Sequence, residues 1–393
     1  MKPTPQRGTY AGPRSVIADR VFDGRRWHDR SAVLLEGERI KGLAACGDVP
    51  PIWPQRNLPN GTILAPGFID LQVNGGGSIL LNDQPTAEGM RAIASAHRRF
   101  GTTGCLPTLI TDTIGQVAIT IEAARAIAGR DGVLGLHVEG PFINPARKGV
   151  HRADRIASAS LADLEILGPL GAAGRSLVTL APECVPAGFV RRLSESGIRV
   201  SAGHSEATAH QIAHAVDDGL TGVTHLLNAM PPLTARAAGI VGATLADNRL
   251  VAGLIVDGIH VDPIAVRAAF AAKGADGIAL VTDAMPTVGS DADGFDLMGM
   301  SIQLANGRLT TEDGTLAGAH LDMASAVRNA VNLAGLSLAD ALRSASRTPA
   351  RFLGLEGERG CLVAGAYADL VALTPSLDVI ATWVAGDEAC YGD

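Results

Sequence analysis

The sequence predicts an α/β protein, a (β/α)8 barrel of the TIM type with a small β-sandwich domain built from both chain termini. Three observations predict this fold. Eight short apolar runs of strand length alternate with helix-like segments between residues 65 and 354. Four of these runs end in residues that can bind a metal or move a proton: Glu139, His204, His225 and Asp283. Short β-type runs without a long helical pattern occupy both ends of the chain.

The composition is that of an ordinary globular protein. The chain has 393 residues, 47% hydrophobic and 19% charged, which is enough for one large and one small domain. The net charge is −7 and the 33 Lys and Arg residues are dispersed, so we expect neither a nucleic-acid nor a membrane partner. The first residues lack a signal-peptide pattern, and the five cysteines form no CxxC pair. We therefore expect a cytoplasmic protein with reduced thiols.

The two ends of the chain are predicted to fold together. Short β-runs fill residues 16–22, 31–35, 39–43 and 61–64, and two more lie at residues 368–373 and 379–384. Neither group is large enough to bury its own apolar face. We therefore predict one β-sandwich domain from residues 1–64 and 355–393, attached to the barrel.

Residues 65–354 carry the predicted barrel. Its strands are expected at residues 67–73, 104–109, 133–138, 177–181, 198–202, 222–225, 250–256 and 278–281. Helices are expected between them, for example at 87–100, 114–128, 206–217 and 263–272, the last with Asp262 as its N-cap. A Gly- and Asp-rich segment at 287–318 contains strand-like pieces and is predicted to be a hairpin insertion that acts as a lid or as an interface.

The strand ends carry the chemistry. Residues 133–138 form an apolar run that stops at Glu139, followed by Gly and Pro. A carboxylate there needs a metal, a catalytic role or an ion-pair partner, because burying an unpaired charge is costly. His204, His225 and Asp283 follow three further strand runs in the same way. For any one of these residues alone, a helix cap or a core histidine is the simpler interpretation. Four such residues at the strand ends of one predicted barrel favour an active site.

Several motifs together resemble a known family. They are Ala65-Pro-Gly-Phe-Ile-Asp70-Leu-Gln72-Val-Asn74, His137-Val-Glu139-Gly-Pro-Phe142, Lys148-Gly-Val-His151, Ser201-Ala-Gly-His204, Thr224-His-Leu-Leu-Asn228, Asp257-Gly-Ile-His260 and Val281-Thr-Asp283-Ala. In this order they resemble the N-acetylglucosamine-6-phosphate deacetylases of the amidohydrolase superfamily. The resemblance covers most of the chain and implies a barrel of the amidohydrolase type.

One divalent metal ion per chain is expected. Glu139, His204 and His225 supply one carboxylate and two imidazoles, a ligand set typical of catalytic zinc, and Fe2+, Co2+ and Mn2+ are the alternatives. His137 shares the inward face of its strand with Glu139, so its approach to the metal is an alternative, but we expect it to support the ligands instead of binding the ion. Gln72 and Asn74 carry amides, which are poor zinc ligands, and no lysine stands at a strand end to bridge two ions.

The resemblance also implies the roles of other residues. Asp283 would be the general base and then the general acid, and His151 would stabilise the oxyanion. The other implied substrate contacts are Val150, Asn228, Ala229, Arg236, His260, Leu316 and Gly318. Arg236 would reach the phosphate from a neighbouring subunit of a homodimer. From sequence alone, an exposed loop histidine and a solvated arginine remain the alternatives for His151 and Arg236.

The expected reaction is hydrolysis of the acetamide of N-acetylglucosamine 6-phosphate to glucosamine 6-phosphate and acetate. The alternatives are the same reaction on N-acetylgalactosamine 6-phosphate or another N-acyl compound, and a non-catalytic scaffold. His320 and Asp322 lie where relatives carry small hydroxyl residues, which leaves the preferred sugar open. Asp322 can still cap the following helix.

Overall fold

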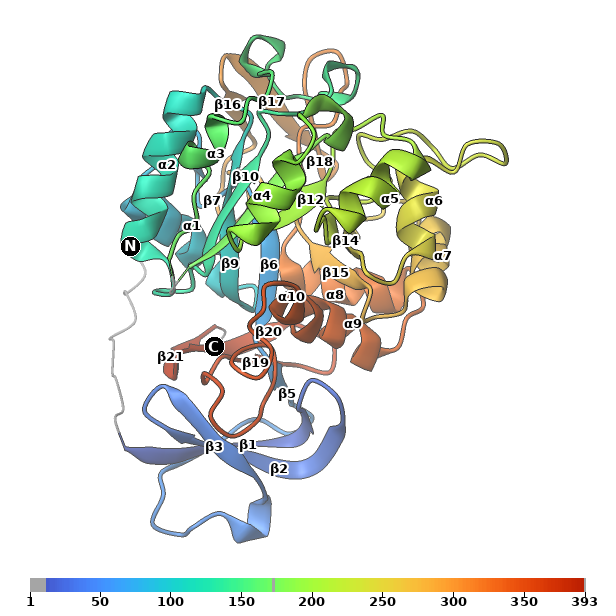
Figure 1. Ribbon diagram of the computed structural model, residues 1–393. Helices are drawn as coiled ribbons and strands as arrows, with labels where there is room; N and C mark the ends of the chain where they lie inside the picture. Colours follow the sequence, from blue (N-terminus) through green and yellow to red (C-terminus); the bar gives the residue numbers. More distant parts are fainter. Residues whose placement is uncertain (1–11, 172–173, 392–393) are drawn as a thin grey trace.

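The computed structural model describes residues 12–171 and 174–391, and Figure 1 shows a barrel with a smaller β-domain at one end. The barrel is a parallel eight-stranded sheet in the order β15-β14-β13-β12-β11-β10-β9-β6. Its strands are β6 Phe68–Val73, β9 Thr102–Ile110, β10 Gly135–Glu139, β11 Arg175–Leu180, β12 Arg199–Ala202, β13 Gly222–Val223, β14 Val251–Ile255 and β15 Ile278–Val281. All eight predicted runs therefore form barrel strands, and the predicted fold class is confirmed.

The first and last strands meet and close the barrel. The backbone N–H of Asp283 donates to Gln72 O at 3.0 Å, and the N–H of Asn74 donates to Ala284 O at 2.9 Å. The Thr282 hydroxyl donates to the buried carboxylate of Asp70 at 2.5 Å. Asp70 thus supports the junction between the first and last strands.

Helices cover the outside of the barrel (Figure 1). They are α1 Ala87–Arg98, α2 Ile114–Ile127, α3 Asp163–Ile166, α4 Phe189–Glu195, α5 Ala209–Asp217, α6 Gly239–Ala246, α7 Pro263–Lys273, α8 Met323–Asn332, α9 Leu338–Ala345 and α10 Arg347–Phe352. Asp262 accepts a hydrogen bond from Ile264 N at 2.7 Å, and Asp322 accepts one from Ser325 N at 2.8 Å, so both predicted caps are confirmed. Helix α5 begins three residues later than predicted, because Thr208 and Gln211 form a capping box there.

Strands from both termini form one sheet in the order β21-β20-β19-β5-β1-β2-β3, with β4 paired to β1. They are β1 Pro13–Phe22, β2 Trp27–Glu36, β3 Arg39–Ala45, β4 Gln55–Asn57, β5 Ile63–Pro66, β19 Leu370–Leu373, β20 Val379–Val384 and β21 Asp387–Cys390. The ends of the chain join where Leu64 of β5 pairs with Ala372 of β19, above a core that includes Trp383. We keep 1–64 with 355–393, and 65–354, as proposed domain limits; residues 1–11, 172–173 and 392–393 lie outside the described residues.

The segment at 287–318 contains a small antiparallel sheet, β16 Gly294–Leu297, β17 Met300–Ala305 and β18 Arg308–Thr310. Leu297, Ile302 and Leu309 pack against Met285 and Ile110 beside the barrel strands. Figure 1 shows this sheet at the end of the barrel away from the β-domain. It therefore stands beside the carboxyl ends of the barrel strands.

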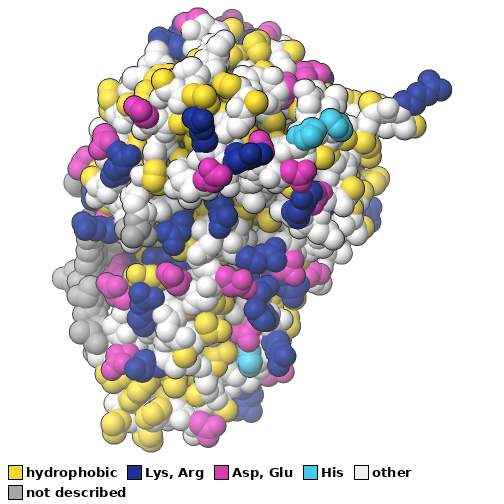
Figure 2. Space-filling view, in the orientation of Figure 1, with side chains coloured by type: hydrophobic (Ala, Val, Ile, Leu, Met, Phe, Trp, Pro, Cys, Tyr) yellow, Lys and Arg dark blue, Asp and Glu magenta, His cyan; other side chains and the backbone are white. Residues whose placement is uncertain are grey.

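Two surface properties are plain. Acidic and basic side chains are interspersed over the face of the molecule in Figure 2. None of the described helices is both long and apolar enough to cross a membrane.

Candidate active site

A cavity of about 360 Å³ opens at the carboxyl ends of the barrel strands. Eleven of the twelve residues that the sequence assigned to catalysis, metal binding or substrate binding line it: Glu139, Val150, His151, His204, His225, Asn228, Ala229, His260, Asp283, Leu316 and Gly318. They lie at the ends of different strands or in the loops that follow these strands. The remaining one, Arg236, lies elsewhere.

Glu139 is the centre of the site. It ends β10, and only 1% of its surface is exposed. Its Oε1 lies 3.0 Å from His225 Nε2 and 3.3 Å from His204 Nε2. Burial acts to raise the pKa of Glu139, but the two imidazoles outweigh it and hold this pKa well below its usual range. The carboxylate is therefore ionised in its buried position.

The two histidines fit a divalent cation. His204 Nδ1 lies 2.7 Å from the carbonyl oxygen of Arg147, which can only accept, so this nitrogen carries the proton. In the neutral ring, Nε2 then presents a lone pair toward His225 Nε2 at 3.1 Å and toward the Glu139 carboxylate. Burial opposes protonation of His225, but the Glu139 carboxylate outweighs it and raises this pKa, so the three atoms favour a positive charge between them. The donor set of one carboxylate and two imidazoles matches that of catalytic zinc.

Both histidines sit on strained backbone. The φ angles of His204 and His225 are 49° and 32°, and Asp283 has a φ of 52°. Positive φ is uncommon for residues other than glycine and costs free energy. Such strain persists where the surrounding structure fixes the residue, and it clusters at functional sites. Here the three strained residues follow the ends of β12, β13 and β15, and their side chains line one cavity.

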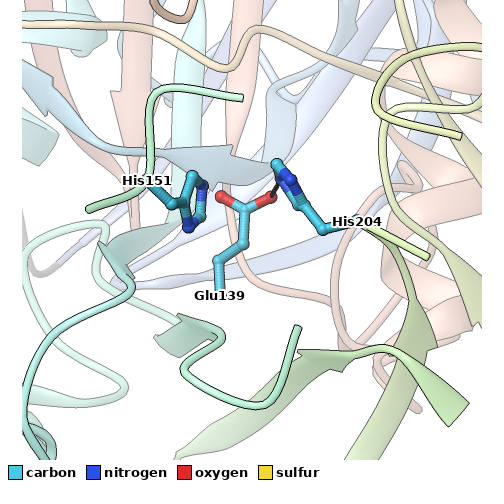
Figure 3. Close-up of side chains that lie close together, drawn as sticks. All are labelled: Glu139, His151 and His204. Atoms are coloured by element: carbon cyan, nitrogen blue, oxygen red, sulfur yellow. Dashed lines mark ion pairs between the residues drawn. The ribbon is translucent and has the colours of Figure 1, made fainter. Parts of the chain in front are cut away.

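His151 joins the cluster although it is far from a strand end. One ligand atom each of Glu139, His151 and His204 lie within 4.8 Å of one another, and Figure 3 shows the carboxylate between the two imidazoles. His151 Nδ1 lies 2.7 Å from Thr111 Oγ1, and only 4% of the residue is exposed. The alternative of an exposed loop histidine is therefore wrong. Burial, with the nearby His204, lowers the pKa of His151 to about 3, so the ring is neutral at pH 7.

Asp283 is held by two amides. Its Oδ1 accepts hydrogen bonds from Gln72 Nε2 at 2.9 Å and from Asn74 Nδ2 at 2.7 Å. Gln72 Nε2 also lies 3.1 and 3.2 Å from the two oxygens of Glu139. Burial and the charge of Glu139 raise the pKa of Asp283. The side-chain amide of Gln72 therefore donates to both carboxylates, Glu139 and Asp283, whose environments differ.

His137 lies outside the cavity lining. Its Nε2 lies 2.7 Å from Thr179 Oγ1, and its Nδ1 lies 3.3 Å from Thr108 Oγ1. Burial lowers its pKa to about 4. These contacts place it among the threonines of neighbouring strands, beneath the cluster.

The other side of the cavity carries hydrogen-bonding groups. His260 Nδ1 lies 2.6 Å from Asp257 Oδ2, which fixes the ring and leaves Nε2 toward the cavity that His260 lines. Asn228 Nδ2 is buried and has no hydrogen-bond partner among the described residues. A buried amide without a partner is costly, so this donor is suited to an oxygen-rich ligand.

Arg236 is exposed and does not line the cavity of its own chain. It belongs to the segment between β13 and α6, which projects away from the body of the protein (Figure 1). His320 is also exposed, with Nδ1 2.9 Å from Thr287 Oγ1, and lies outside the lining.

Two groups that contact the site histidines were not predicted from the sequence, the Thr111 side chain and the Arg147 carbonyl. Thr111 follows directly after β9, so the strand-end rule would have found it.

The barrel and its metal-ligand cluster define a metal-dependent hydrolase of the amidohydrolase type, and the family model described as "Amidohydrolase family" matches residues 63–389. The chain belongs to the amidohydrolase family. It is 41% identical to the N-acetylgalactosamine-6-phosphate deacetylase of Shewanella sp. (strain ANA-3) over 85% of this chain and 84% of the relative.

Two further relatives are named N-acetylglucosamine-6-phosphate deacetylase. The N-acetylglucosamine-6-phosphate deacetylase of Haemophilus influenzae is 33% identical, over 90% of this chain and 93% of the relative. The crystal structure of N-acetylglucosamine-6-phosphate deacetylase from Pasteurella multocida is 32% identical and superposes with a TM-score of 0.92, covering 96% of this chain and 100% of that one. The family that the motifs indicated is confirmed.

Proposed function

We propose that this protein hydrolyses the acetamide group of N-acetylglucosamine 6-phosphate, giving glucosamine 6-phosphate and acetate. The observation that carries the proposal is the convergence of a buried metal-ligand cluster and Asp283 on one cavity. A non-catalytic scaffold would not need these groups on strained backbone in a shared cavity.

Glu139, His204 and His225 would hold one divalent cation, and zinc suits this ligand set best. Fe2+, Co2+ and Mn2+ are the other candidates. Such a cation polarises a carbonyl oxygen and makes a water molecule more acidic. Gln72 and Asn74 would not bind a second ion, because neutral amides are poor ligands for zinc and the N–H groups that they direct at Asp283 have no lone pair to offer.

Asp283 would move the protons. Its Oδ1 is occupied by Gln72 and Asn74, so Oδ2 is the oxygen left to take a proton from the attacking water. The same carboxyl group would then give this proton to the departing amine nitrogen. Its raised pKa makes it a better base than an ordinary aspartate.

His151 would stabilise the oxyanion of the tetrahedral intermediate. Its ring is neutral, and Nδ1 can accept a hydrogen bond from the Thr111 hydroxyl. In that tautomer Nε2 carries a proton and can donate to the developing negative charge. Leu316, Gly318 and Val150 would form the apolar side of the sugar pocket, since they line the same cavity.

The phosphate would be bound by Asn228, the Ala229 backbone and His260, with Arg236 supplied by the neighbouring subunit of a homodimer. Asn228 Nδ2 is a buried donor without a partner among the described residues. Arg236 is exposed and does not line the cavity of its own chain. A guanidinium suits phosphate because it presents a planar fork of donors.

N-acetylgalactosamine 6-phosphate is the second candidate substrate, because one of the relatives named above, 41% identical, is named for it. The test is acetate release from both phosphorylated sugars and from N-acetylglucosamine without phosphate. We expect the two phosphorylated sugars to have much higher kcat/KM values than the plain sugar, with the gluco epimer preferred. A preference for the galacto epimer would select the second candidate, and no acetate from any of them would contradict both.

We predict that Asp283→Asn lowers kcat by roughly a hundred- to ten-thousand-fold, because the nearly isosteric amide cannot accept the proton of the attacking water. Metal content and substrate binding should stay close to those of the unmodified protein. Asp262→Asn is the matched control, since Asn also caps a helix and Asp262 does not itself line the cavity. A kcat near that of the unmodified protein would contradict the proton-transfer role, and loss of the metal would make Asp283 a ligand instead.

We predict that Arg236→Ala raises KM selectively for phosphorylated sugars, because each lost charge-assisted hydrogen bond is worth roughly 1.5–3 kcal/mol. Arg267→Ala is the control, a charge removed from α7 outside the cavity lining. Mixing Arg236→Ala chains with Asp283→Asn chains under conditions of subunit exchange should restore part of the activity. Hybrid dimers without recovered activity would contradict the role across the subunit boundary.

A further inference from the structure

The segment after β11 contributes a carboxylate that contacts the loops of two proposed metal ligands. Glu183 lies in a short 3-10 helix, Pro182–Cys184, directly after β11. Its side chain is half-buried and does not line the active-site cavity. In the barrel sheet, β11 lies between β10, which ends at Glu139, and β12, which leads to His204. Glu183 therefore follows the strand between those that carry two of the three ligands.

Three hydrogen bonds from neutral donors fix the Glu183 carboxylate. Its Oε1 accepts from Asn144 Nδ2 at 3.0 Å and from the backbone N–H of Glu206 at 2.6 Å. Its Oε2 accepts from the Ser205 hydroxyl at 2.7 Å. Asn144 belongs to the loop after β10, whereas Ser205 and Glu206 follow His204 directly. One carboxylate thus joins the loop after β10 to the residues that follow His204.

His204 is held at the same junction. Its Nδ1 lies 2.7 Å from the Arg147 carbonyl oxygen, and its own carbonyl oxygen accepts from the Asn144 N–H at 2.9 Å. Asn144 also caps the turn that contains Arg147, because its Oδ1 accepts from the Ala146 N–H at 3.0 Å. The carbonyl that orients the imidazole therefore belongs to a turn whose cap is hydrogen-bonded to Glu183.

The backbone at His204 requires such restraint. Its φ is 49°, a conformation that costs free energy for a residue other than glycine and persists where surrounding contacts impose it. The ring must also keep its Nδ1 proton on the Arg147 carbonyl if Nε2 is to face a cation. The Arg147 and Glu206 side chains form an ion pair between the same two loops. Several contacts therefore converge on the orientation of one imidazole.

We propose that Glu183 is a positioning residue for the metal site: its carboxylate holds the loop after β10 and the residues after His204 together, so that His204 presents Nε2 to the cation. The inference rests on the proposed metal site. Glu183 touches neither the cation nor the substrate in this role, because it does not line the cavity. It acts through accepted hydrogen bonds, since all three of its donors are neutral.

The test is the zinc dissociation constant of metal-stripped, folded protein, measured by competition with a chelating dye. Glu183→Ala removes all three contacts and should weaken zinc binding about 10- to 100-fold, the usual loss for a residue that orients a metal ligand. Glu183→Gln should restore most of the affinity, because its oxygen still accepts and its amide can donate to the Ser205 hydroxyl. Glu195→Ala, which removes an exposed carboxylate of α4, is the matched control and should leave the affinity unchanged.

The link through Asn144 is tested by a double-mutant cycle. Asn144→Ala should also weaken zinc binding, because it releases the turn that carries the Arg147 carbonyl. Glu183 and Asn144 share one contact, so Glu183→Ala should cost less zinc affinity in the Asn144→Ala background than it costs alone. Fully additive losses would show that Glu183 does not act by joining the two loops, and would overturn the proposal.

A merely structural role gives a different result. It would lower the melting temperature of metal-stripped Glu183→Ala and leave the zinc affinity of the folded protein unchanged. That result, or an equal loss of affinity in Glu183→Gln, would overturn the proposal. If Glu183→Ala does not fold, Glu183→Asp decides instead: it keeps the charge on a shorter side chain that cannot span both loops, so weaker zinc binding supports positioning and unchanged binding contradicts it.

Failure of this inference is distinguishable from failure of the proposed metal site. Tight binding of about one zinc per chain by both the unmodified protein and Glu183→Ala would overturn the positioning role alone. An unmodified protein that binds no zinc would overturn the metal site, and the positioning role with it.

Discussion

The site depends on one electrostatic constraint, which is that a buried carboxylate and two imidazole nitrogens face a common point. Glu139 Oε1, His204 Nε2 and His225 Nε2 lie 3.0 to 3.3 Å apart. Their separations follow from strand ends that are fixed by the barrel and from histidines held at positive φ. A cation between them offsets both the donor repulsion and the cost of burying the charge. The closed barrel and the strained backbone therefore position the same three atoms that would bind the cation.

The first strand completes this arrangement with amides in place of further metal ligands. Gln72 donates to Glu139 and to Asp283, and Asn74 donates to Asp283 alone. A neutral donor between two carboxylates reduces their repulsion without adding a charge. The hydrogen bonds from Gln72 and Asn74 also leave Oδ2 of Asp283 as the oxygen for the proposed proton transfer. The site is thereby divided into a carboxylate that stays ionised and one whose pKa is raised.

Features that depend on neighbours in the sequence were predicted better than features that depend on contacts between distant residues. The eight strand runs and the caps at Asp262 and Asp322 depend on neighbours in sequence, and the structure has all of them. The burial of His151 depends on Thr111, 40 residues away, so the sequence alone favoured an exposed loop. The hydrogen bonds from Gln72 to both Glu139 and Asp283 require a strand register that no local pattern specifies. The proposed phosphate contact of Arg236 depends on a second chain.

The central claim is that one cation at Glu139, His204 and His225 makes the cavity active. It is tested most directly by adding zinc in substoichiometric steps to metal-stripped protein while acetate release from N-acetylglucosamine 6-phosphate is measured. We expect activity to rise in proportion to zinc and to reach its plateau at about one equivalent per chain, because the structure presents one complete ligand set of this kind within the described residues. Full activity without metal, or a plateau that requires two equivalents, would contradict the claim.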